Sequence, residues 1–140
     1  MKINTIITTA ILSLAANLSH AGNLTFTIKQ VKSDQGSIYL KLYKGKANYK
    51  ADKAHAAHQV PAKTGDISIG FDELPSDDYA IRYYHDENAD GKLQKNLFGI
   101  PTEGYGFSSN ARGNFGPPSF EKMKVTVDDT DIHDTSTIKY

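Results

Sequence analysis

Residues 24–29 read Leu-Thr-Phe-Thr-Ile-Lys, in which an apolar side chain alternates with a polar one at every step. Residues 38–43 repeat the pattern as Ile-Tyr-Leu-Lys-Leu-Tyr. Such alternation is typical of a β-strand that buries one face, because successive side chains of a strand point to opposite sides. Between the two stretches, residues 33–36 (Ser-Asp-Gln-Gly) have the composition of a turn. Residues 23–43 are therefore predicted to form a β-hairpin.

The same pattern recurs along the rest of the chain. Residues 67–71 predict a third strand, residues 79–84 a fourth and residues 122–127 a fifth, and a turn at 128–131 leads to a last strand that ends near Tyr140. The apolar residues that define the third and fifth strands are Ile67, Ile69, Phe71, Met123, Val125 and Val127. Six to seven short strands in a chain of this length predict an all-β fold, an antiparallel β-sandwich or barrel.

The amino terminus has the features of a secretory signal peptide. Lys2 supplies a positive charge, residues 6–18 are mainly apolar, and Ser19-His20-Ala21 places small residues at the positions that precede cleavage. The alternative is a membrane anchor, but the apolar stretch is shorter than the roughly 20 residues that a spanning helix needs. Cleavage before Gly22 would release a single domain, residues 22–140, to the periplasm or the exterior with no membrane insertion.

The charge and composition exclude several classes of protein. The chain has 140 residues, with 16 Lys plus Arg against 16 Asp plus Glu, so no net charge attracts nucleic acid or an anionic membrane. It contains no Cys, which removes disulfides, thiolate metal ligands and a Cys nucleophile. With 39% hydrophobic and 23% charged residues, the composition is typical of one globular domain held by a hydrophobic core.

Residues 44–65 interrupt the strands and are predicted to cross between them. Ala51–His58 is predicted as a short helix or helical turn. If it is helical, Asp52, His55 and His58 would lie on adjoining turns and could offer a transition metal one carboxylate and two imidazoles. The favoured interpretation is a solvated connector, because His-x-x-His in an Ala- and Lys-rich segment lacks the ligand number of a metal site.

A long loop spans Asp86–Glu121 and opens on Asp-Glu-Asn-Ala-Asp-Gly. This fits the first half of a calcium loop, with side-chain oxygens from Asp86, Asn88 and Asp90 and a sharp turn at the glycine. The backbone carbonyl of Lys92 and the carboxylate of Glu103 would complete the calcium ligands. The slightly favoured alternative is a turn in which these side chains cap backbone amides. Positions nine and twelve are Gln94 and Leu97, which excludes an EF-hand.

Aromatic residues are concentrated in the rest of this loop, at Phe98, Tyr105, Phe107, Phe115 and Phe120. One interpretation is a binding face, made by Tyr105, Phe107, Ser108 and Phe115, on which sugar rings stack. The favoured interpretation is that the aromatics pack on one another, because a long loop must bury something to stay ordered and exposed apolar patches are uncommon on monomers.

Several segments resemble a bacterial exported family catalogued as domain of unknown function 2141. They are His85-Asp86-Glu87-Asn88, Gly91-Lys92-Leu93, Phe98-Gly99-Ile100-Pro101, Glu103-Gly104-Tyr105-Gly106-Phe107-Ser108 and Phe115-Gly116-Pro117-Pro118-Ser119-Phe120-Glu121. The resemblance implies a small exported protein with no assigned activity. Residues 71–81 are also similar to the strand-turn-strand of transthyretin-like and carboxypeptidase-regulatory-like modules, which implies a transthyretin-like or Ig-like β-sandwich with one long ordered loop and an accessory, non-catalytic role.

These observations predict a secreted, non-catalytic binding or accessory module that recognises a protein or glycan partner, with calcium as the candidate cofactor. The first alternative is a small periplasmic hydrolase in which His85 acts as a base with Asp86 or Glu103, and Ser108 as nucleophile. The sequence has no G-x-S-x-G, H-E-x-x-H or phosphate-loop motif. The second alternative is a purely structural envelope protein.

Overall fold

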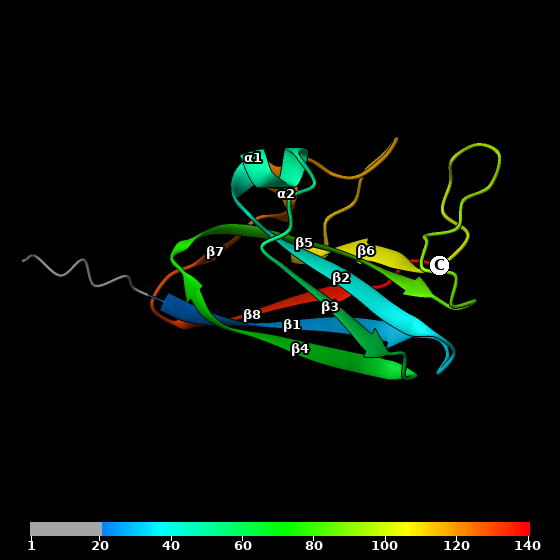
Figure 1. Cartoon of the computed structure of the whole chain (residues 1–140), viewed down its shortest axis with the longest axis horizontal. Coiled ribbons are helices and arrows are strands. Elements are labelled where there is room, and N and C mark those ends of the chain that lie inside the picture. Colours follow the sequence, from blue (N-terminus) through cyan, green and yellow to red (C-terminus); the bar gives the residue numbers. More distant parts are fainter. Residues whose placement is uncertain (1–20) are drawn as a thin grey trace, which may run out of the picture.

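A computed structural model describes residues 21–140 of the chain, which form two packed β-sheets with two short helices on one side (Figure 1). The all-β sandwich predicted from the alternating patterns is confirmed. The predicted signal peptide lies outside the described residues except for Ala21, which begins the first strand. No helix among the described residues has the length and apolar character to cross a membrane.

The first sheet has three strands in the order β4 (Gly65–Pro75), β1 (Ala21–Val31) and β8 (Asp131–Thr137). β1 is antiparallel to β4 but parallel to β8, so the predicted antiparallel sandwich contains one parallel pair among its described strands. The parallel pairing arises because the chain passes from one sheet to the other before β8. β7 (Val125–Val127) pairs with the other sheet, so residues 128–130 carry the chain between sheets and β8 enters alongside β1 in the same direction.

The second sheet contains β3 (Ala56–Pro61), β2 (Ser37–Lys44), β5 (Asp77–Asp86) and β6 (Tyr105–Phe107) in that order, with β7 also paired to β5. β1 and β2 therefore lie in different sheets, and the predicted hairpin over residues 23–43 is wrong. Alternation along a strand tells which face is buried but does not tell which strand is its partner.

The core lies between the two sheets. The inward residues of β1 and β2 alternate with less buried ones, as predicted. They face each other across the core, and the two strands are not hydrogen-bonded neighbours in a sheet. The buried residues of the two sheets include Leu24, Phe26, Ile28, Ile38, Leu40, Leu42, Ile69, Phe71, Tyr79, Ile81 and Tyr83. Fully burying one such side chain stabilises a fold by roughly 1.5–3 kcal/mol, so this cluster is the main source of stability.

The segments between the predicted strands contain more structure than the sequence indicated. β3 and β6 were not predicted, and they bring the described chain to eight strands. The helix of the connector is α1, Gly45–Lys50, which ends before the predicted helix at Ala51–His58 begins. A second helix, α2, spans Phe120–Met123 and takes Met123 out of the predicted fifth strand.

The two helices cover one half of the outer face of the five-stranded sheet. Figure 1 shows α1 and α2 together on the side of β2 and β5 that faces away from β1 and β4. Beneath them a second apolar cluster contains Ala80, Phe107, Ala111, Phe120 and Met123, with Tyr49 and Tyr105 partly buried against it. The other half of that face has no helix above it, and the candidate site lies there.

Candidate functional site

An open groove of about 690 Å³ lies on the uncovered half of the five-stranded sheet. Its floor comes from the outward positions of adjacent strands, and the pairing register sets these side chains in two rows. In the first row Tyr39 is opposite Tyr84, which is opposite Tyr105. In the second, Lys41 is opposite Arg82, which is opposite Phe107. Neighbouring strands are about 4.8 Å apart, so each row is a continuous strip of side chains across β2, β5 and β6.

The walls of the groove come from the two halves of the long loop. Gly91, Leu93 and Lys95 line one side, and Pro117 lines the other. The Tyr84 hydroxyl donates a hydrogen bond to the Gly91 carbonyl at 3.0 Å and ties the wall to the floor. Figure 1 shows both loop segments projecting from the same side of the five-stranded sheet, away from β1 and β4.

The tyrosines of the floor form an aromatic surface. The rings of Tyr39 and Tyr84 are stacked, with centroids 5.3 Å apart and an interplanar angle of 8°. Tyr105 meets Phe107 edge to face at 6.1 Å. Partial burial raises the pKa of the Tyr84 hydroxyl above its ordinary value, so this group stays a neutral hydrogen-bond donor at physiological pH. Such residues present a large apolar surface together with a polar tip.

The groove carries basic side chains, Lys41, Arg82 and Lys95, and no acidic residue lines it. Asp52 accepts hydrogen bonds from both Lys41 Nζ, at 3.2 Å, and Arg82 Nη2, at 2.5 Å. It also accepts one from the Tyr43 hydroxyl at 2.6 Å. The Tyr43 bond is the largest cause that lowers the pKa of the Asp52 carboxyl, followed by Lys41 and Arg82. Asp52 is therefore an anion that positions the cations of the second row.

The predicted calcium residues form a turn whose carboxylates already bind backbone amides. Asp86 accepts hydrogen bonds from the amides of Asp90 and Gly91 at 3.1 and 2.8 Å. Asn88 Oδ1 also accepts from the Asp90 amide, and Asp90 Oδ1 accepts from the Lys92 amide at 2.9 Å. Gly91 adopts a φ of +75°, the conformation that the predicted sharp turn requires of its glycine.

Glu103 holds the same turn from the far end of the loop. Its two oxygens accept the backbone amides of Glu87 and Gln94, each at 3.0 Å. Among residues 21–140, no three His, Asp or Glu side chains are grouped closely enough to hold a metal ion. The arrangement fits the amide-capping alternative, and a cation would have to replace several of these hydrogen bonds.

A thermal melt of the purified protein in chelator and then in millimolar calcium tests the calcium prediction. Because the carboxylates already have partners, we expect the melting temperature to be unchanged by calcium, and Asp90→Ala to melt identically in both conditions. An ion that binds only the folded state would raise its stability by roughly 1.4 kcal/mol at ten times Kd. A calcium-dependent rise that Asp90→Ala abolishes would contradict this expectation and establish an ion-braced turn.

His85 and Ser108 have structural hydrogen bonds and do not line the groove. His85 is fully buried, with Nδ1 2.8 Å from the Tyr140 hydroxyl and Nε2 2.6 Å from the Gln35 carbonyl oxygen. Since a carbonyl only accepts, Nε2 carries the proton. Ser108 is also fully buried; its hydroxyl accepts from the Ile81 amide and donates to the Met123 carbonyl at 2.6 Å, where β6 ends. Ser108 of the predicted binding face thus joins β5 to the segment before β7.

The loop aromatics are divided between core and solvent, so the prediction that all five pack together is wrong. Phe107 and Phe120 are buried beneath the helices, whereas Phe98 is 89% exposed and Phe115 of the predicted binding face is fully exposed. Hydrogen bonds order the tip at Phe98 instead: Asn96 Oδ1 accepts from the amides of Phe98 and Ile100. This turn displays Leu97, Phe98 and Ile100 to solvent.

The three side chains of the alternative transition-metal site, Asp52, His55 and His58, are not brought together within the described residues. His55 and His58 do not lie on a helix, because His58 is in β3 and His55 directly precedes it. His58 packs edge to face on Phe71, and His55 on Tyr79, at centroid distances of 5.1 and 5.8 Å. Asp52 instead belongs to the cluster with Tyr43 and Arg82.

Tyr39, Lys41, Arg82 and Tyr84 are the functional candidates that the sequence did not single out. They occupy outward positions of correctly predicted strands, where the pattern alone indicates only a solvated face. The feature of the sequence that could have identified them is their residue type. An outward face that carries large aromatic and cationic residues instead of Thr and Ser exposes more apolar surface than a solvated strand requires.

The fold and the groove define a small all-β sandwich domain with an open groove on the outer face of one sheet. A family model described as an uncharacterized protein conserved in bacteria, DUF2141, matches residues 26–134, and the chain belongs to that family. No curated protein and no solved structure matches it, so the similarity to transthyretin-like modules stays a prediction.

Proposed function

We propose that this protein is an exported, non-catalytic binding module, periplasmic or extracellular, whose ligand is a saccharide chain held in the outer-face groove. The observation that carries the proposal is the row Tyr39, Tyr84 and Tyr105 on the floor of an open groove. Ligand sites are concave and lined mainly by apolar and aromatic side chains with a few polar groups for orientation. The groove has this composition.

The chemistry of the floor favours a sugar ring over a fully apolar ligand. A pyranose presents C–H groups on its faces and hydroxyls around its rim, and tyrosine rings match the former while hydroxyl, amide and ammonium groups match the latter. Gln59 and Lys41 border the tyrosine row and supply such polar groups. The groove opens to solvent, so a sugar ring bound in it can belong to a longer chain.

The non-catalytic part of the proposal is supported by the hydrogen bonds of the alternative catalytic residues. His85, Asp86 and Glu103 are buried, and none of them lines the groove. A catalytic acid or base must reach the proton that it transfers. In this fold Asp86 and Glu103 instead accept backbone amides of the loop that forms the groove wall, and His85 bonds to Gln35 and Tyr140 outside that loop.

A protein partner is the second candidate, and the exposed apolar loop tips favour it. Leu97 and Phe115 are fully exposed, and Phe98 and Ile100 are largely so. Clustered apolar side chains on a surface are typical of sites that contact another macromolecule. A partner that binds these tips would leave the tyrosine row free, so the two candidates make different predictions for variants of the floor.

Titration of the purified protein against a panel of envelope polysaccharide fragments tests the saccharide proposal. Tyr84→Ala is expected to weaken binding at least tenfold, about 1.4 kcal/mol, because it removes the central ring of the row. His133→Ala is the matched control, since His133 is an exposed ring residue on β8 in the other sheet. If no fragment binds, or if Tyr84→Ala binds as tightly as the parent protein, the groove is not a saccharide site.

A further inference from the structure

The charge of the groove differs from that of the whole chain. The chain balances 16 basic against 16 acidic residues, yet the groove is lined by Lys41, Arg82 and Lys95 with no carboxylate among its lining residues. A concave site lined by one sign of charge concentrates the electric field and favours ligands of the opposite sign. A neutral protein with a basic groove therefore has a local preference for anions that its net charge conceals.

The charges of two of the three cations are partly offset by one neighbouring carboxylate. Asp52 pairs with Lys41 and with Arg82, so one carboxylate faces two cations and the group keeps a net positive charge. Within the described residues, Nη2 is the one nitrogen of the Arg82 guanidinium that donates a hydrogen bond. The Arg82 side chain remains about one-third exposed. The guanidinium thus has further donors for a ligand, and Asp52 holds it in position against the Tyr43 ring at 5.2 Å.

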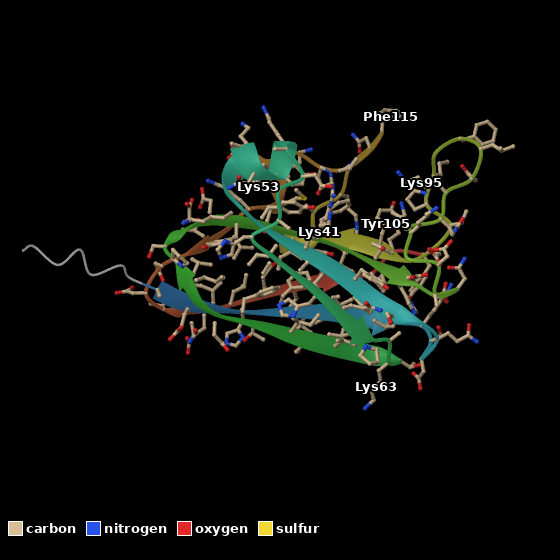
Figure 2. The ribbon with its side chains drawn as sticks, viewed as in Figure 1. Lys41, Lys53, Lys63, Lys95, Tyr105 and Phe115 are labelled. Atoms are coloured by element: carbon tan, nitrogen blue, oxygen red, sulfur yellow. The ribbon has the colours of Figure 1, made fainter. Side chains whose placement is uncertain are left out.

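Lys95 is the third cation and has no acidic partner. Within residues 21–140 no ion pair joins its ammonium to a carboxylate, whereas Lys32, Lys44 and Lys124 each have at least one. It lies on the loop wall, where the Lys95–Pro101 bridge fixes its backbone. Figure 2 shows Lys95, Lys41 and Tyr105 on the same side of the five-stranded sheet and Lys63 at the opposite edge of the molecule. Lys95 thus adds an unneutralised charge above the floor.

We propose that the groove selects acidic saccharides, in which sugar rings stack on the tyrosine row while their carboxylate groups bind Lys95 and Arg82. The inference rests on the proposed saccharide site and adds the charge of its ligand. Charge-assisted hydrogen bonds from Arg and Lys to carboxylates are about twice as strong as neutral ones. The two rows of the floor lie side by side, so an anion on a stacked ring meets the cationic row without leaving the groove.

Two other anionic polymers fit the geometry less well. An extended peptide that binds by adding a strand needs a free sheet edge, but the floor is a sheet face whose backbone groups are paired between β2, β5 and β6. Single-stranded nucleic acid stacks on aromatic residues, but such sites lie in extended basic surfaces that follow the phosphates. Here only three cations line the groove, in a chain whose formal net charge is zero.

Calorimetric titration with oligogalacturonate and oligomannuronate, each beside its methyl ester, tests the inference. The ester keeps the rings and linkages but removes the charge. We expect at least one acid to bind at least tenfold more tightly than its ester, with an affinity that falls as salt rises. Lys95→Gln should weaken binding of the acid about fivefold and leave the affinity for the ester unchanged. Lys63→Gln, the matched control, should change neither affinity.

The outcomes separate this inference from the proposed function. If each acid binds no better than its ester, or if Lys95→Gln matches the parent protein, charge selection is wrong, while saccharide binding that requires Tyr84 would still stand. If no acid, ester or neutral fragment binds, both are wrong. If oligothymidylate or polyglutamate binds as tightly as the better acid, the groove is a general polyanion site and the saccharide inference is overturned.

Discussion

Replacing Phe120 by alanine is expected to destabilise the protein by about 3–5 kcal/mol, the usual cost of truncating a buried phenylalanine. Phe120 begins α2 and is 5% exposed, in the cluster with Ala80, Phe107 and Met123. Removing the ring leaves a void that this second cluster cannot fill without moving α2. Phe107 belongs to the same cluster and lines the groove, so the end of the groove floor should loosen as well.

Phe115→Ala is the matched control, since it removes the same ring five residues earlier in the same loop. Phe115 is fully exposed. The free energy of unfolding of the variant should therefore lie within about 0.5 kcal/mol of that of the parent protein, as is usual for surface substitutions. Urea denaturation followed by circular dichroism measures both. Equal losses of stability in the two variants would contradict the division of the loop aromatics into core and solvent.

That division shows what the sequence could and could not predict. Alternation identified the inward faces of β1, β2 and β4 correctly, because burial of one strand face depends on local pattern. It did not identify the partners of β1 and β2, because one apolar pattern serves a hairpin and two facing sheets equally well. The interpretation of the loop aromatics failed at Phe98 and Phe115 for a similar reason: Asn96 orders the tip by hydrogen bonds that no hydrophobic pattern records.

The site was predicted less well than the fold. The sequence drew attention to Asp86 and Glu103, whose spacing is distinctive, and the structure places both at the base of the groove wall. The floor was missed because it depends on register between strands far apart in the chain. Tyr39 and Tyr84 are 45 positions apart and become a stacked pair only when β2 pairs with β5. Period-2 patterning does not fix such a register.

The second large effect is expected at Glu103, whose carboxylate joins the two ends of the loop wall. It is 6% exposed and accepts the backbone amides of Glu87 and Gln94. A hydrogen bond to a charged group contributes roughly 1.5–3 kcal/mol, and a buried donor left without a partner adds a desolvation penalty. Glu103→Ala should therefore lower the free energy of unfolding by about 3 kcal/mol or more.

The position of the lost hydrogen bonds makes the prediction specific. Hydrogen exchange should accelerate at the amides of Glu87 and Gln94 before it does so in β2 and β5, because the wall detaches while the sheets remain. Glu121→Ala is the control: Glu121 is more than half exposed, and its ion pairs within the described part of the chain are with Lys46 and Lys124 at the surface, so its loss should cost at most about 1 kcal/mol. The wall that carries Lys95 begins at these amides. Glu103→Ala should therefore also weaken the binding of any ligand whose affinity Lys95→Gln lowers. Undisturbed exchange at both amides would mean that the wall is held by other contacts, and that Glu103 does not shape the groove.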